Sequence, residues 1–184
     1  ISNIQGDFQC KDYFYVKEFV MPFIRVAGDM TIALNSGSVN TAAEIEFPKL
    51  LEIGGTLTLE NNKNANNITF PSLKKILGSC SVTTYKLKND IEFTNLESIG
   101  TDGADAQIKF EIEGTNILCP KLKAINGKFD IATSSFMFDM EADQVSYPNV
   151  ESISENLSIT CPYSDFGSNG ILSIDFSGLK SVKG

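Results

Sequence analysis

The phrase IEFPKLLEI occupies residues 45–53, and a near copy, ITFPSLKKI, occupies residues 68–76. Both follow the pattern apolar-x-aromatic-Pro-x-apolar-x-x-Ile. The other copies read IEFTNLESI at 91–99, ILCPKLKAI at 117–125, VSYPNVESI at 145–153 and IDFSGLKSV at 174–182, with a looser first copy, FVMPFIRV, at 19–26. Self-similarity at a short fixed period is typical of solenoids and related repeat folds. The chain therefore consists of about seven copies of one structural unit.

The copies are unequally spaced. The closing Ile or Val falls at 53, 76, 99, 125, 153 and 182, which gives steps of 23, 23, 26, 28 and 29 residues. A second phrase, Gly-x-apolar-x-apolar, follows the closing residue. Its copies are GDMTI at 28–32, GTLTL at 55–59, GSCSV at 78–82 and GKFDI at 127–131, with degenerate copies GDF at 6–8, IKFEI at 108–112 and ENLSI at 155–159.

Both phrases alternate apolar and polar residues, which places the apolar side chains on one face of a β-strand. Gly before one strand and Pro after the other supply the corners. We therefore predict a mainly β fold: a right-handed parallel β-solenoid of about seven turns, each with two such strands and 23–29 residues long. It forms a single domain over 1–184, with an N-terminal turn and cap at 1–26 and six regular turns at 27–182. The coil possibly continues beyond residue 184.

Composition restricts the partners. The 184 residues include 23 acids and 15 bases, for a formal charge of −8, with no His and no Trp, and Arg25 is the only Arg. An acidic chain is not expected to bind nucleic acid or an anionic membrane surface. Without His, the commonest general base and metal ligand is missing. No apolar run reaches the roughly 18 residues that span a bilayer.

The segments FPSLKKI (70–76) and IGGTLTLENN (53–62) resemble the receptor L-domain and its leucine-rich-repeat-like bacterial relatives. Such domains occur in insulin and growth-factor receptors, in fungal wall proteins and in secreted or lipid-anchored proteins of gut Bacteroidetes. This chain lacks the disulfide pattern of the animal receptors, so the bacterial relatives are the nearer comparison. The resemblance implies an exported, cell-surface protein with a role in adhesion or host contact. It assigns no binding residue.

The four cysteines are expected to be free thiols. Cys80 takes the place of Leu57 one turn earlier, and Cys119 takes the place of Phe70 and Phe93, so both are expected to be buried. Cys10 and Cys161 follow strands in the first and last turns, too far apart to form a bridge. With no Cys-x-x-Cys and no His, we expect no zinc site and no cofactor.

The outward positions of the Gly-x-apolar-x-apolar strand form the first candidate surface. One column of that strand holds Asp7, Asp29, Thr56, Ser79, Lys109, Lys128 and Asn156, and the next holds Gln9, Thr31, Thr58, Ser81, Glu111, Asp130 and Ser158. Extended solenoid faces often bind partners, although a solvated strand face explains the same pattern. The candidate binding residues are Thr31, Thr56, Thr58, Ser79, Ser81, Lys109, Glu111, Lys128, Asp130, Asn156 and Ser158.

The segment between residues 132 and 144 is the second candidate. Phe136, Met137, Phe138 and Met140 are apolar outside the repeat register, so they form either a cover on the coil or an exposed interaction patch. The aromatic stretch at 12–23 is expected to cap the first turn.

Three functions remain open at this stage. The first is a non-catalytic cell-surface or secreted module that binds a protein or glycan, and the second is a structural spacer that displays another domain. The third is a polysaccharide-active enzyme, which would need two carboxylates about 5–10 Å apart; Glu111 and Asp130 would be neighbours in one column. We expect a monomer that neither binds nucleic acid nor inserts into a membrane. Export to the cell surface is expected, with any lipid anchor on a segment not present here.

Overall fold

A computed structural model describes residues 2–11, 18–33, 43–60, 65–83, 89–103, 105–112, 116–133, 144–160 and 173–184. These residues form strands, turns and bends, and none of them is helical. Every strand pairing recorded among them is parallel. The prediction of a mainly β, parallel solenoid is therefore confirmed.

The strands form three long sheets and one short sheet. Sheet A has eight strands: β1 (Asn3–Ile4), β4 (Arg25–Val26), β7 (Glu52–Ile53), β10 (Lys75–Ile76), β13 (Ser98–Ile99), β16 (Ala124–Ile125), β19 (Ser152–Ile153) and β22 (Ser181–Val182). Sheet B has seven: β2 (Phe8–Lys11), β5 (Met30–Ala33), β8 (Leu57–Glu60), β11 (Cys80–Thr83), β14 (Ala106–Ile112), β17 (Gly127–Thr133) and β20 (Leu157–Thr160). Sheet C has five: β3 (Glu18–Val20), β6 (Ala43–Glu46), β9 (Ala65–Thr69), β12 (Ile91–Glu92) and β15 (Ile117–Leu118). Sheet D pairs β18 (Gln144–Ser146) with β21 (Ser173–Asp175).

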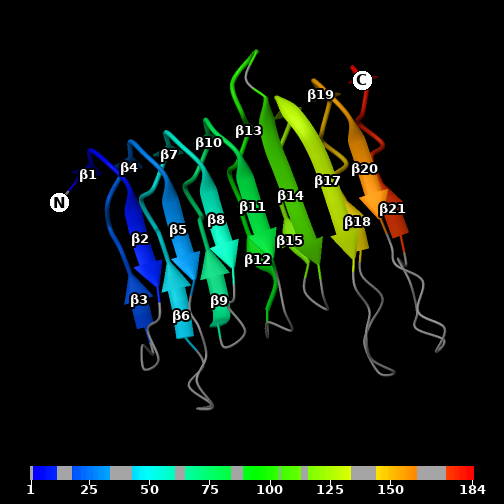
Figure 1. Cartoon of the computed structure of the whole chain (residues 1–184). Helices are drawn as coiled ribbons and strands as arrows, with labels where there is room; N and C mark the ends of the chain where they lie inside the picture. Colours follow the sequence, from blue (N-terminus) through cyan, green and yellow to red (C-terminus); the bar gives the residue numbers. More distant parts are fainter. Residues whose placement is uncertain are drawn as a thin grey trace.

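Each turn runs through sheet A, sheet B and then sheet C or D, and the turns lie side by side from the blue to the red end of the chain (Figure 1). Five turns contribute to all three long sheets, and two more place their third strand in sheet D. The prediction of two strands per turn was wrong, because the closing apolar residue lies in a third strand. The strands of sheet A contain only two residues, which is too short for an alternating pattern to be visible in the sequence.

The repeat register predicted from the closing residue is confirmed. Ile53, Ile76 and Ile99 are direct partners in sheet A, and the column continues through Ile125, Ile153 and Val182. In sheet B, Leu57 is paired with Cys80, as the second phrase predicted.

The register predicted for the fifth turn was wrong by two residues. Lys109 is paired with Asp130 and Ser81, Glu111 is paired with Ala132, and Gln107 lies opposite Lys128. A shift of two residues keeps every side chain on the same face of a strand. The alternating pattern therefore could not distinguish the two alignments.

The inward positions of the three sheets form one continuous core. In the middle turns Leu57, Leu59, Ile68, Phe70 and Ile76 are all fully buried. At the equivalent positions of the last described turn, the exposed fractions are 55% for Ile174 and 44% for Val182. Burial at one repeat position therefore depends on having a turn on either side.

Large and small side chains exchange places within this core. Phe47, Phe70 and Phe93 stack face to face along sheet C, with centroids 5.1 and 5.0 Å apart. In the next turn Cys119 occupies the aromatic position, and Phe110 and Phe129 enter from sheet B, with centroids 5.2 Å apart. The smaller side chain in one sheet is thus matched by a larger one from the opposite sheet, which keeps the interior filled.

The corners are joined by hydrogen bonds between side chains and the adjacent turn. Ser72 Oγ donates to the carbonyl of Pro48 at 2.7 Å, and Asn149 Nδ2 donates to the carbonyl of Pro120 at 2.8 Å. At the other corner, Asp29 Oδ1 accepts from the N–H of Thr56 at 2.6 Å. A Cβ on Gly55 would overlap the Asp29 carboxylate and the neighbouring backbone, so this corner requires glycine.

Cys10, Cys80 and Cys119 are free and buried, as predicted. Burial raises the pKa of the Cys80 and Cys119 thiols. Cys10 lies within β2 opposite Ile32, and not after the strand as the sequence suggested. Cys161 lies outside the described residues.

In the aromatic N-terminal stretch, the described residues 18–23 belong to an ordinary first turn. Phe23 is buried, and its ring lies 5.1 Å from that of Phe8. The other part of the predicted cap, residues 12–17, lies outside the described residues.

Candidate functional site

The predicted binding residues are brought together on the outer side of sheet B. Its central column, established by the strand pairings, contains Gln9, Thr31, Thr58, Ser81, Lys109, Asp130 and Ser158. A second column contains Thr56, Ser79, Gln107, Lys128 and Asn156. Glu111 lies two residues beyond the central column.

Several of these side chains hold the coil together. Ser79 Oγ accepts a hydrogen bond from the N–H of Gln107 at 3.0 Å, in the same way that Asp29 accepts from Thr56. A buried or partly buried backbone N–H needs such a partner. Part of the polar character of this face is therefore explained by turn-to-turn stitching.

The proposed carboxylate pair is not formed, because Asp130 lies opposite Lys109 and not opposite Glu111. Lys109 Nζ lies 2.6 Å from Glu111 Oε1, and Thr83 Oγ1 donates to Glu111 Oε2 at 2.8 Å. The hydrogen bond from Lys109, followed by that from Thr83, lowers the pKa of Glu111 below its ordinary value. A general acid for glycoside cleavage requires a raised pKa, so this carboxylate is not suited to that role.

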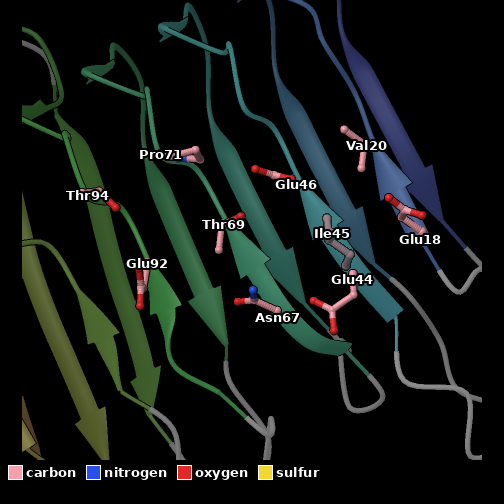
Figure 2. Close-up of a pocket in the computed structure, with 10 residues that line it drawn as sticks. All are labelled: Glu18, Val20, Glu44, Ile45, Glu46, Asn67, Thr69, Pro71, Glu92 and Thr94. Carbon is pink, nitrogen blue, oxygen red and sulfur yellow. The ribbon is translucent and has the colours of Figure 1, made fainter.

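A surface that the sequence reading missed lies on the outer face of sheet C. Figure 2 shows a hollow of about 320 Å³ there, which spans four turns. Its lining residues are Glu18, Val20, Glu44, Ile45, Glu46, Asn67, Thr69, Pro71, Glu92 and Thr94. None of these ten described residues is basic or aromatic. We call this surface the sheet C hollow.

The strand register explains why its carboxylates gather. Glu18 lies opposite Glu44, and Glu44 lies opposite Asn67, so they share one column of the sheet. A second column contains Val20, Glu46, Thr69 and Glu92. Neighbouring strands lie about 4.8 Å apart, which brings carboxylates of successive turns close together. The signal in the sequence was the middle residue of apolar-x-aromatic, which is Glu in IEF at 45–47 and again at 91–93.

The outer side of sheet A has a different charge pattern. Arg25 Nε lies 2.8 Å from Glu52 Oε1, and Lys180 Nζ lies 2.6 Å from Glu151 Oε2. A column beside these strands alternates in charge through Lys74, Glu97, Lys123, Glu151 and Lys180, each joined to the previous turn by its backbone N–H. The positive charge of Lys180, with that of Lys123, lowers the pKa of Glu151. The charges on this face largely balance one another.

A second hollow, of about 380 Å³, lies at the corner of the fourth to sixth turns. It is lined by Glu97, Pro120, Lys121, Lys123 and Asn149. Two of its polar groups already have partners within the protein, because Lys121 Nζ donates to Asn95 Oδ1 at 2.6 Å and Asn149 donates to Pro120. It offers fewer free groups to a ligand than the sheet C hollow does.

The apolar residues predicted as a loop patch, Phe136, Met137, Phe138 and Met140, lie outside the described residues. Within the part of the chain that the structure describes, no cluster of His, Cys, Asp or Glu has the arrangement of a metal site. That part also contains no helix of the length and hydrophobicity needed to cross a membrane. We compared the chain with protein-family models, curated proteins and solved structures, and none of them matches it.

Proposed function

We propose that this chain is a non-catalytic binding module of an exported protein, and that it contacts a protein or glycan partner. The observation that carries the proposal is the sheet C hollow, a depression across four turns that is lined by carboxylate, amide and hydroxyl side chains. Extended solenoid faces present residues from successive turns in register, so one partner can contact several repeats at once.

The charge of the hollow indicates which partner fits it best. Four of its ten lining residues are Glu, and none of the ten is Lys or Arg. An anionic glycan would be repelled, and a neutral sugar would find no aromatic ring on which to stack among these residues. A basic protein segment would gain both attraction and hydrogen-bond acceptors, because complementary charge favours association and suppresses wrong partners. The geometry therefore favours a protein partner over a glycan.

The resemblance to receptor L-domains and their bacterial relatives supports the place of action. Those relatives are exported, and several are surface proteins associated with adhesion. We infer the same location for this protein, at the cell surface or secreted, with a lipid anchor on another segment if one exists. The coil is proposed to act as a monomer.

The test is an array of extracellular proteins and glycans, probed with the labelled 184-residue chain. The first variant replaces Glu18, Glu44, Glu46 and Glu92 with Gln. The matched control replaces Glu52, Glu97, Glu151 and Glu155 with Gln, so both variants have the same net charge. We expect the first variant to lose at least about tenfold in affinity, equivalent to about 1.4 kcal/mol, and the control to keep its affinity. Equal losses in both variants would mean that binding follows net charge and does not use the hollow.

The second candidate is a structural spacer that displays another domain. The balanced charges of sheet A and the stitched polar face of sheet B are the observations that favour it. A spacer would bind no member of the array, whereas the binding module would. A polysaccharide-active enzyme is the least supported candidate, because the Glu111 and Asp130 pair on which it depended is not formed.

A further inference from the structure

No further inference is drawn: the strongest candidate, the carboxylate-lined hollow on the outer face of sheet C, belongs to the site already described, and nothing else in the structure shows which cation, metal or peptide would occupy it.

Discussion

Leu57→Ala is expected to destabilise the coil far more than Leu157→Ala, although both residues occupy the same position of the repeat. Leu57 is fully buried between its partners Met30 and Cys80. Leu157 has Phe129 on one side only, and it is partly exposed in the last described strand of sheet B. The two changes remove the same atoms, so the difference between them isolates the effect of a turn on either side.

The magnitude follows from burial. Replacing Leu with Ala removes three carbon atoms, which at about 0.8 kcal/mol each represents about 2.4 kcal/mol of lost transfer free energy. The cavity that remains adds to this, and fully buried Leu→Ala changes cost about 2–5 kcal/mol in total. At Leu157 part of the surface is already in water and the neighbouring side is open. We therefore expect less than about half of the Leu57 effect there.

The free energy of unfolding would be measured for both variants and the parent chain by urea denaturation under the same conditions. Hydrogen exchange of the β8 and β20 amides would show whether the loss is local, since turns of a solenoid can open separately. A neutral Leu57→Ala variant would refute the repeat alignment. Equal losses at both positions would refute the claim that burial depends on two neighbouring turns.

The other predictions concern a corner, the thiols and one carboxylate. Gly55→Ala should destabilise the coil by about 1–3 kcal/mol, because its Cβ would overlap Asp29 and the adjacent backbone. Gly6→Ala, where a Cβ would have open space, should stay within about 0.5 kcal/mol by the same denaturation measurement. Iodoacetamide at neutral pH should leave three thiols unmodified in the native chain and label them after unfolding, as read by peptide mass spectrometry; these thiols are Cys10, Cys80 and Cys119. The pKa of Glu111 is lower in the folded chain than its ordinary value of 4.5, so its contribution to stability is present above that pH and is lost as the pH falls through the folded pKa. The stability of Glu111→Gln should accordingly vary less with pH in the acidic range than that of the parent chain, and identical pH profiles would contradict the assignment.

Much of the fold could be predicted because each repeat position carries its own constraint. The closing Ile is buried in every middle turn, and this requirement fixed its spacing in the sequence. The alignment of Lys109 and Glu111 could not be predicted, since alternation determines the face of a strand but not a register shift of two residues. In that turn the unit is longer, and the extra residues could be assigned before or after the strand.

The candidate site was only partly predictable. The residues expected on one outer face do lie together on sheet B, because strand alternation decides which side chains point outward. The sheet C hollow was missed because the outward residues of the aromatic phrase, such as Glu46 and Glu92, are separated by 46 positions 23 apart in two steps of the repeat. Their proximity depends on the stacking of β6, β9 and β12, and it becomes evident only when that phrase is read down the turns.

The exchange of large and small side chains in the core limits how freely the repeats could be recombined. The turns that close at Ile76 and Ile99 have equal length, and both place Phe at the sheet C corner. The turn containing Cys119 depends instead on Phe110 and Phe129 from the opposite sheet. A unit moved from one half of the coil to the other would set two large or two small side chains at the same level. Duplication or deletion of a turn is therefore compatible with the core in the first half, whereas in the second half it would require compensating substitutions in the facing sheet.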